Sequence, residues 1–455
     1  MLSFNPEKSH YFYVGVAGSG MSALAQYQVM AGGTVSGSDR DWNPDDPGHR
    51  YDLYRKMGIN FFPQDGSGLE RSITAVVKST AIENSNPDLK AAEALKIPVL
   101  HRSEVLANWV NTKKCIAVAG TSGKSTVTAM IFDLLEGVSA SPSVITGGDL
   151  ESLKRKHLPG NAFAGNSDLL VVEADESDGT LVEYHPHVGL LLNIEKDHKE
   201  ISDLLPLFEK FMKQSSLRVV NADDSRIAGI VPRSASFGES ESAKYRITDI
   251  RLSPRSGSFK LNGVDFTVPW PGKYSIINAS AALSVCAELG FKLEDLRKPL
   301  SVFAGVGRRF QSCGVKRGVE VIDDYAHNPA KLEAAIKAAQ SCSKRVIAVF
   351  QPHGYGPARF MRHDYVASFV NAMNENDILY MPEIFYAGGS VVKDISSADI
   401  VADIKTKGRD SRFVANRSDL PALIAKEAKE GDIVMVMGAR DSSLTTLAKS
   451  IAAAL

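Results

Sequence analysis

The chain alternates short apolar runs, rich in β-branched residues, with segments whose apolar residues recur at helical spacing. This alternation is typical of parallel sheets covered by helices, so it predicts an α/β fold. The clearest predicted strands span residues 11–16, 34–37, 75–77, 98–100, 115–119, 169–172, 188–192, 319–322, 345–350, 378–381 and 433–437. The clearest predicted helices span residues 21–30, 103–110, 276–289, 330–339 and 420–428.

Changes in composition divide this pattern into three regions. A polar stretch at residues 111–114 precedes a fresh strand, and a third region begins near Cys313. Between them, residues 235–270 are richer in Ser and Gly, and Asn262-Gly263 is a typical two-residue hairpin turn. At about 150 residues per domain, the length also favours three domains. We expect them at residues 1–112, 113–312 and 313–455.

The overall charge narrows the class of partner. The 52 Lys and Arg nearly balance the 53 Asp and Glu, which argues against a polybasic surface for nucleic acid and against an acidic tail. No apolar run approaches the ~18–20 residues of a membrane span, and residues 1–10 do not resemble a secretory signal. The four cysteines form no C-x-x-C pair, so we expect buried, reduced thiols. These features predict a cytoplasmic enzyme.

A glycine-rich turn between a predicted strand and a predicted helix carries the strongest signal for chemistry. Its sequence is Val118-Ala-Gly-Thr-Ser-Gly-Lys-Ser-Thr126, a variant P-loop with Val118 where the general pattern has glycine. Such a loop lets backbone N–H groups approach phosphate, with Lys124 on the terminal phosphates and the Ser125 hydroxyl near Mg²⁺. A turn that merely caps a helix would not explain the lysine and the hydroxyls. The predicted phosphate-binding residues are Gly120, Thr121, Ser122, Gly123, Lys124, Ser125 and Thr126.

Two neighbouring predicted strands end in polar residues. One runs into the acidic stretch Glu173-Ala-Asp-Glu-Ser-Asp178, and the other into Glu195-Lys-Asp-His198. Carboxylates at the carboxyl edge of a parallel sheet, beside a P-loop, can hold a hard divalent cation. His198 fits a metal ligand or a γ-phosphate contact, but a surface or satisfied core histidine fits its position equally well.

A second glycine-rich turn lies near the start of the chain. Gly18-Ser-Gly-Met-Ser-Ala23 fits the G-x-G-x-x-A form after a strand, and Asp39 ends the next strand. Such a turn binds any diphosphate, and tight packing of strand on helix also explains it. An NAD-binding oxidoreductase is therefore an alternative, although it leaves Gly120–Ser125 unexplained.

A late cluster follows two further strands. It consists of Gly307-Arg-Arg-Phe310, Asp323-Asp-Tyr-Ala-His-Asn-Pro329 and Gln351-Pro-His353. Arginine forks suit phosphates or carboxylates, and aspartates at strand ends suit ribose hydroxyls. Ion pairing of the two arginines and helix capping by Asn328 are the structural alternatives. Two such loops at the ends of parallel strands favour a binding site.

In this order the motifs resemble those of the Mur ligase family, ATP-dependent amide ligases of cell-wall precursor synthesis. The likeness extends over nearly the whole chain. The matching motifs are Val14–Ala23, Val35–Asp39, Val77–Ile82, Asn86-Pro87, His101–Leu106, Gly120–Ser125, Glu173–Asp178, Asn193–His198, Asp323–His327 and Phe350–His353. The resemblance implies an N-terminal Rossmann-like UDP-binding domain, a central P-loop ATPase domain and a C-terminal Rossmann-like domain.

The resemblance also implies residue roles. The implied catalytic residues are Lys124, His198, Arg309, His327 and His353. The implied metal ligands are Ser125, Glu173 and His198. Asn278 is expected near the adenine, Arg309 near the γ-phosphate and Asp324 on the ribose. The implied UDP-sugar residues are Gly18, Ser19, Gly20, Met21, Ser38, Asp39, Ser79 and Thr80.

The implied reaction joins the carboxylate of UDP-N-acetylmuramate to an amino acid, L-alanine by default, with ATP and Mg²⁺ as cofactors. The carboxylate attacks the γ-phosphate to give an acyl phosphate, and the amine then displaces phosphate. The protein contributes orientation and charge neutralisation. We expect the C-terminal domain to close and bring Asp324 and His327 to ATP, and the protein to be a monomer or a homodimer.

Some positions depart from the family pattern. Alanine-adding members usually carry arginines where this chain has Gly354 and Pro357, and the nearest arginine is Arg359. Those arginines are expected to hold the carboxylate of the amino acid, so another amino acid or a murein tripeptide stays an alternative acceptor. Tyr274-Ser275 replaces a usual His-Asn pair and could alter the adenine pocket. A catalytically silent relative is a further alternative, against which the retained Lys124 argues.

Overall fold

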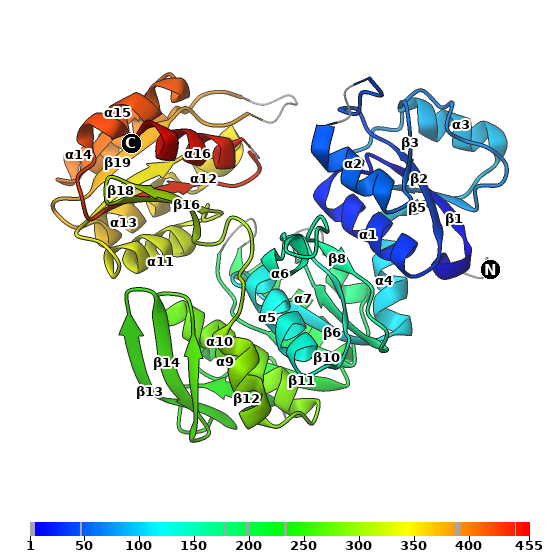
Figure 1. Ribbon diagram of the computed structural model, residues 1–455, viewed down its shortest axis with the longest axis horizontal. Coiled ribbons are helices and arrows are strands. Elements are labelled where there is room, and N and C mark those ends of the chain that lie inside the picture. Colours follow the sequence, from blue (N-terminus) through cyan, green and yellow to red (C-terminus); the bar gives the residue numbers. More distant parts are fainter. Residues whose placement is uncertain are drawn as a thin grey trace. The chain divides into compact units, whose positions relative to one another are not determined.

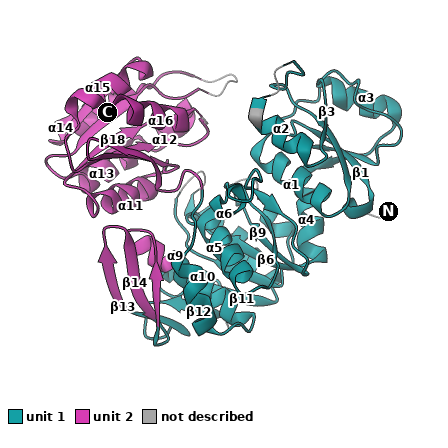
Figure 2. Cartoon of the chain, in the orientation of Figure 1, with its two compact units in different colours: residues 1–248, 261–264, 278–306 teal, residues 249–260, 265–277, 307–455 magenta. Residues whose placement is uncertain are grey.

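The structure is a computed structural model. It describes residues 5–45, 48–176, 179–196, 200–231, 234–386, 392–441 and 443–455. The chain divides into two compact units (Figure 2). Unit 1 comprises residues 1–248, 261–264 and 278–306, and unit 2 comprises residues 249–260, 265–277 and 307–455.

The first sheet of unit 1 has five parallel strands in the order β3-β2-β1-β4-β5 (Figure 1). Its strands are β1 His10–Val14, β2 Thr34–Ser38, β3 Asn60–Phe62, β4 Ala75–Lys78 and β5 Val99–His101. Its helices are α1 Ser19–Met30, α2 Gly48–Lys56, α3 Pro87–Leu95 and α4 Arg102–Thr112. The chain runs outward from β1 to β3 and then returns to β4 on the other side of β1. This reversal makes a switch point at β1 and β4, where open α/β sheets bind ligands at the carboxyl ends of their strands.

The central region of unit 1 is built on strands in the order β12-β11-β10-β6-β9-β7-β8. The strands are β6 Lys114–Ala119, β7 Ser143–Ile145, β8 Ala162–Phe163, β9 Leu169–Glu173, β10 Val188–Leu191, β11 Leu217–Asn221 and β12 Ala235–Gly238. The helices are α5 Lys124–Gly137, α6 Glu151–Lys154, α7 Ile201–Gln214, α8 Ser225–Ala228 and α10 Arg297–Ser301, together with α9 Lys273–Glu288, which belongs to unit 1 from residue 278 onward. All pairings are parallel except that of β7 with β8, and residues 115–119 of β6 are completely buried, as expected of a parallel strand covered on both faces. The second switch point lies between β6 and β10.

The predicted hairpin is confirmed. Strand β13, Tyr245–Ser253, follows β12, and β14 Ser256–Leu261 is joined to β15 Val264–Val268 by the turn Asn262-Gly263. Both turn residues have positive φ, +50° and +84°, which is the requirement of a type I′ turn.

The sheet of unit 2 has the strand order β16-β17-β21-β18-β19-β20, with only β16 antiparallel to its neighbour. The strands are β16 Gln311–Lys316, β17 Val319–Asp324, β18 Arg345–Phe350, β19 Ile378–Pro382, β20 Asp410–Val414 and β21 Asp432–Met437. The helices are α11 Pro329–Gln340, α12 Tyr355–Phe360, α13 Arg362–Ala372, α14 Ser397–Thr406, α15 Leu420–Glu427 and α16 Leu444–Ala454. Because β21 lies between β17 and β18, the loops after these three strands meet at one edge of the sheet.

The structure confirms the α/β prediction and adds one correction. Cys115 and Cys286 are buried as expected, but Cys313 and Cys342 are partly exposed, because they lie on an edge strand and just after α11. All four cysteines lie within the described ranges, and none forms a disulfide there. Among the helices that the structure describes, none combines the length and the apolar character needed to cross a membrane.

Candidate active site

The P-loop joins β6 to α5 and takes a backbone conformation that requires glycine. Gly120 and Gly123 have φ of +130° and +89°, a region that L side chains rarely adopt. Gly123 is the N-cap of α5, and the N–H groups of the first helical turn have no intrahelical acceptors, so this end of the helix favours an anion. A Cβ atom at Gly123 would lie 2.8 Å from Oδ1 of Asn278, which places Asn278 beside the loop.

Lys124 is nearly buried and lies beside the buried Glu176 and the exposed Asp175. Its Nζ is 2.6 Å from Oε2 of Glu176 and 3.7 Å from Oδ1 of Asp175. Burial alone would lower the pKa of Lys124, but the Glu176, Asp175 and Glu173 carboxylates outweigh that effect and raise it. Lys124 is therefore a fixed positive charge at the start of α5, and Glu176 holds it in place.

Ser125 and Glu173 meet below the loop, as the predicted metal site requires. The Ser125 hydroxyl donates to Oε1 of Glu173 at 2.9 Å, and the Thr146 hydroxyl and the Gly147 N–H donate to Oε2 at 2.9 and 3.1 Å. These oxygen atoms match the ligand preference of Mg²⁺, which takes few protein ligands and completes its shell with phosphate and water. The third predicted ligand, His198, lies outside the described residues. Within the described ranges no group of three or more His, Cys, Asp or Glu side chains is placed to hold a metal ion.

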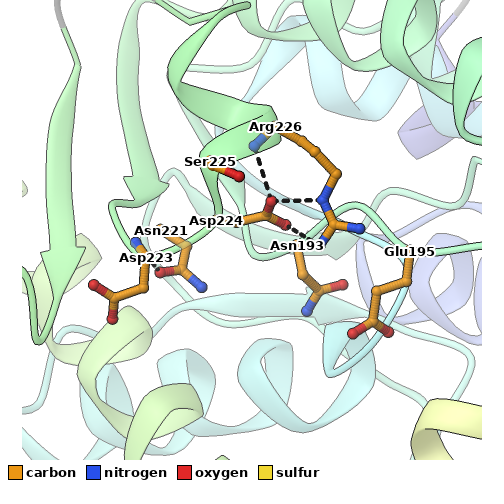
Figure 3. A pocket seen from close by; sticks show the side chains of 7 residues that line it. All are labelled: Asn193, Glu195, Asn221, Asp223, Asp224, Ser225 and Arg226. Carbon is orange, nitrogen blue, oxygen red and sulfur yellow. Dashed lines mark hydrogen bonds and ion pairs between the residues drawn. The ribbon is translucent and has the colours of Figure 1, made fainter.

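A polar pocket of about 320 Å³ lies next to the P-loop, at the carboxyl ends of β10 and β11 (Figure 3). It is lined by Asn193, Glu195, Asn221, Asp223, Asp224, Ser225 and Arg226. Arg226 pairs with Asp224 at 2.8 Å, and Asp224 also accepts the N–H of Ile194 at 3.0 Å. On the loop side, Ser122 donates its hydroxyl to Oε2 of Glu195 at 2.9 Å. The pocket wall thus supports the back of the phosphate-binding loop.

The predicted UDP-sugar residues lie at the carboxyl edge of the first sheet. Gly18 is the N-cap of α1, whose first turn holds Ser19, Gly20 and Met21, and Ser79 and Thr80 follow β4. These residues flank the switch point between β1 and β4. A Cβ atom at Gly20 would lie 2.9 Å from Nη1 of Arg102, so a guanidinium stands at this turn. Arg102 lies in the matching motif His101–Leu106, but the sequence analysis assigned it no role at the site, because it is far from the turn along the chain.

Ser38 and Asp39, at the end of β2, already have protein partners. The Ser38 hydroxyl is completely buried and donates to Oδ2 of Asp88 at 2.5 Å. Asp39 accepts the N–H of Ala17 at 2.8 Å and the hydroxyl of Tyr51 at 3.3 Å. Both side chains therefore help to fasten the turn and the strand end, and the role predicted for them at a UDP-sugar stays a prediction.

Two predicted histidines meet in unit 2. The ring centroids of His327 and His353 are 5.5 Å apart, with the ring planes at 67°, and both side chains are buried. Nδ1 of His327 is 2.9 Å from the carbonyl oxygen of Tyr325. Because a carbonyl can only accept, Nδ1 carries the proton, and Nε2 is the acceptor in the neutral ring. The structure brings these histidines together from the ends of β17 and β18.

The arginines of residues 307–310 have different environments. Arg308 pairs with the buried Asp323 at 3.3 Å and donates to the carbonyl of Gly438 at 2.8 Å, as the ion-pairing alternative predicted. The guanidinium of Arg309 lies over the ring of Tyr325, 4.6 Å from its centroid, and that of Arg308 lies 5.1 Å from the same centroid. Helix capping by Asn328 is also confirmed, since Asn328 is the N-cap of α11 and accepts the N–H of Lys331.

Asp324, predicted to bind the ribose, is also part of the turn that follows β17. Its carboxylate accepts the N–H groups of Phe310 and Ala326, both at 2.7 Å. Burial raises the pKa of Asp324, whereas the charge of Arg309 and the two N–H donors act in the opposite direction. Each carboxylate oxygen has a second lone pair, so the turn does not use the full capacity of Asp324.

The segment after Phe350 contains Gly354 and Pro357, which replace the arginines expected to hold the carboxylate of the amino acid. Gly354 has φ +74° at the N-cap of α12, and its N–H donates to the carbonyl of Phe385. Arg359, the nearest arginine, pairs with Asp394 at 3.0 Å through Nε.

Tyr274 and Ser275 precede the predicted adenine residue Asn278 along the chain. The Tyr274 hydroxyl is deeply buried, which raises its pKa, and the Ser275 hydroxyl donates to the carbonyl of Pro271.

Comparison with known proteins agrees with this geometry. Three family descriptions match in chain order: the catalytic domain of the Mur ligase family over residues 10–114, the Mur ligase middle domain over residues 118–286, and the Mur ligase glutamate ligase domain over residues 308–440. The chain is 34% identical to the UDP-N-acetylmuramate–L-alanine ligase of Myxococcus xanthus, over 94% of this chain and 92% of that protein. The chain belongs to the Mur ligase family, and it has the three-domain architecture of that family.

Solved structures give the same result. The crystal structure of the UDP-N-acetylmuramate–alanine ligase of Thermotoga maritima superposes with a TM-score of 0.79 at 25% identity, over 98% of both chains. A murein peptide ligase of Psychrobacter arcticus shares the fold, with a TM-score of 0.70 at 18% identity over 98% of both chains. Membership of this family gives no support to the NAD-binding oxidoreductase alternative.

Proposed function

We propose that this chain is an ATP-dependent ligase that joins the carboxylate of UDP-N-acetylmuramate to L-alanine through an acyl phosphate. The observation that carries the proposal is the P-loop with Lys124 at the first turn of α5 and the Ser125–Glu173 pair below it. The full-length similarity to alanine-adding ligases supports the choice of substrates.

The residues of unit 1 would bind and polarise ATP. Lys124 and the N-terminus of α5 would neutralise charge on the transferred phosphate, where fixed donors are most effective. Ser125 and Glu173, together with His198, would hold Mg²⁺, which supplies further charge neutralisation on the phosphates. Asn278, beside Gly123, would contact the adenine. The turn that begins with Gly18 would hold the diphosphate of the UDP-sugar.

The residues of unit 2 would act on the reacting groups of the same ATP. Arg309 would contact the γ-phosphate, and Asp324 would bind the ribose through its remaining lone pairs. His327, whose Nδ1 donates to the carbonyl of Tyr325, would accept a proton at Nε2. Scattering curves measured with and without nucleotide and UDP-sugar test whether binding compacts the chain, and identical curves would contradict this part of the proposal.

A second acceptor remains a candidate because of one local observation. Gly354 and Pro357 cannot hold a carboxylate by charge, and Arg359 is paired with Asp394. A different amino acid or a murein tripeptide could therefore replace L-alanine as the amine, with the ATP half of the reaction unchanged.

An acceptor screen tests the proposal directly. Purified protein would receive ATP, Mg²⁺ and UDP-N-acetylmuramate with L-alanine, with other amino acids singly, or with the tripeptide, and both phosphate release and product mass would be measured. We expect release that depends on UDP-N-acetylmuramate and is fastest with L-alanine. Release that is fastest with the tripeptide would favour the second candidate, and no release above background with any amine would reject the ligase itself.

The proposed domain limits near residues 112 and 312 each lie within five residues of the end or start of a family match, at residues 114 and 308. A cytoplasmic location follows from the use of ATP and a UDP-sugar. The protein is a monomer or a homodimer, which sedimentation at several protein concentrations would decide.

A further inference from the structure

The backbone of the P-loop is held by the side chain of Asn193. Its Oδ1 accepts the N–H of Ser122 at 2.8 Å, and its Nδ2 donates to the carbonyl of Ser122 at 3.0 Å. One side-chain amide therefore satisfies both peptide groups of a single loop residue. The N–H of Ser122 is engaged by the protein, so the phosphate must rely on the N–H groups that follow it in the loop.

Further hydrogen bonds join residues 193–195 to the P-loop. The N–H of Thr121 donates to the carbonyl of Asn193 at 3.2 Å, and the Thr121 hydroxyl donates to the carbonyl of Glu195 at 3.1 Å. The main chain also approaches closely, because a Cβ atom at Gly120 would lie 3.1 Å from the nitrogen of Asn193. The contact is thus continuous along the whole first half of the P-loop.

Asn193 is itself anchored from the pocket side. Asn221 donates to the carbonyl of Leu192 at 3.1 Å, and Asp224 accepts the N–H of Ile194 at 3.0 Å, so both chain neighbours of Asn193 are fixed by residues at and just after the end of β11. Asn193, Asn221 and Asp224 line the same pocket (Figure 3). Asn193 also follows β10, the strand that borders the P-loop strand at the switch point of the central sheet. Asn193 is therefore held from both sides, and it contacts a loop that must direct several N–H groups at one anion.

We propose that Asn193 is a positioning residue for ATP, which fixes the P-loop through its two bonds to Ser122. This inference rests on the proposed function, because it concerns the same nucleotide site. It assigns a role to the wall of the polar pocket, which supports the phosphate-binding loop from behind.

The chain offers a matched control for this pair of bonds. Asn111 also bridges two segments with one amide, since its Oδ1 accepts the N–H of His185 at 2.8 Å and its Nδ2 donates to the carbonyl of Glu183 at 3.2 Å. Asn111 ends helix α4 and touches neither the P-loop nor the pocket. Asn111→Ala removes the same kind of bonds as Asn193→Ala, so any general cost of losing them is common to both variants.

The experiment measures Mg·ADP affinity by calorimetry and the KM values for ATP and UDP-sugar in the full-length protein. We expect Asn193→Ala to weaken Mg·ADP binding and to raise the KM for ATP by about tenfold. A tenfold change corresponds to the net contribution of one hydrogen bond or slightly more. The KM for UDP-sugar should stay within twofold of the wild-type value. Asn111→Ala should leave all three values within twofold. An Asn193→Ala protein that binds Mg·ADP like the wild type, or whose two KM values rise together, would overturn the proposal.

An isosteric variant adds a second readout. In Asn193→Asp the ionised carboxylate keeps the acceptor for the Ser122 N–H but faces the Ser122 carbonyl with a second acceptor. At about pH 7.5 a carboxyl of ordinary pKa is ionised, so this variant should raise the KM for ATP as Asn193→Ala does, with the KM for UDP-sugar within twofold, while Asn111→Asp follows the wild type. A wild-type KM for ATP in Asn193→Asp would count against the proposal.

The calorimetric measurement keeps this inference separable from the proposed function. If the wild type binds Mg·ADP but turns over no substrate, the ligase proposal fails and the Asn193 comparison still stands on binding. If turnover is normal and both Asn193 variants bind Mg·ADP unchanged, the inference alone fails. Should Asn193→Ala not fold, the Mg·ADP affinity and the two KM values of Asn193→Asp provide the decisive result.

Discussion

The P-loop of unit 1 and the histidine–arginine cluster of unit 2 are both predicted nucleotide sites, but they are built differently. In unit 1 the Lys124 and Ser125 side chains bond to other side chains, those of Glu176 and Glu173. In unit 2 Asp324 bonds to two backbone N–H groups, and His327 bonds to a backbone carbonyl. The arrangement in unit 1 places several charges where a bound ligand can contact them. The arrangement in unit 2 fixes the orientation of each side chain.

The largest expected effect removes the charge at the centre of unit 1. Lys124→Ala should lower ATP turnover by about a thousandfold, because it removes the fixed positive charge at the start of α5 that would neutralise the transferred phosphate. Circular dichroism should report an intact fold, since the burial of Glu176 favours its protonation once the lysine is gone. Unchanged turnover would discard the assignment of this site.

The adjacent residues Arg308 and Arg309 of unit 2 test whether an arginine acts on the nucleotide or mainly stabilises the fold. Arg309→Ala should lower kcat by about a hundredfold, as expected for a residue that contacts the transferred phosphate, and should also lower the stability because its charge acts on the buried Asp324. Arg308→Ala should instead lower the free energy of unfolding by about 3 kcal/mol, because it leaves the buried Asp323 without its cation. Steady-state kinetics and thermal melts of both variants would check this, and an exchange of the two phenotypes would invert our interpretation.

The Lys124–Glu176 pair must open for a phosphate to take the place of the carboxylate. Glu176→Gln weakens this competitor by about 1 kcal/mol, the difference between a charged and a neutral hydrogen bond, so the KM for ATP should fall about fivefold. A higher KM would mean that Glu176 orients Lys124 toward the nucleotide rather than competing for it.

The smallest expected effect concerns stability alone. Asp133 lies on α5, and burial raises its pKa to about 6. Because the pKa in the folded state exceeds that in the unfolded chain, folding favours the protonated form, and stability is lost as the pH rises from about 4 to 6. Asp133→Asn should therefore stabilise the protein by about 1 kcal/mol at pH 8 and by less at pH 4.5. The value at pH 8 is smaller than the pKa shift alone would give, because solvent screens part of the effect. Thermal melts at the two pH values would detect it, and an equal gain at both would rule out titration as the cause.

The two sites also differ in how far the sequence could predict them. The P-loop is a contiguous motif, so its residues and its place between β6 and α5 were predicted directly. Glu176 and Thr146 were not assigned roles, because a strand-end carboxylate and a threonine acquire them only through the order of β6, β9 and β7. In unit 2 the insertion of β21 between β17 and β18 brings Gly438 to Arg308, and no local pattern could have predicted that the two neighbouring arginines have different environments.

Isotope transfer tests the central claim most directly. UDP-N-acetylmuramate labelled with ¹⁸O in its carboxylate would be incubated with ATP, Mg²⁺ and L-alanine, and the released phosphate analysed by mass spectrometry. Attack of the carboxylate on the γ-phosphate predicts one ¹⁸O atom in each released phosphate, with ADP as the other product. Product formation with unlabelled phosphate, or with AMP in place of ADP, would contradict the account.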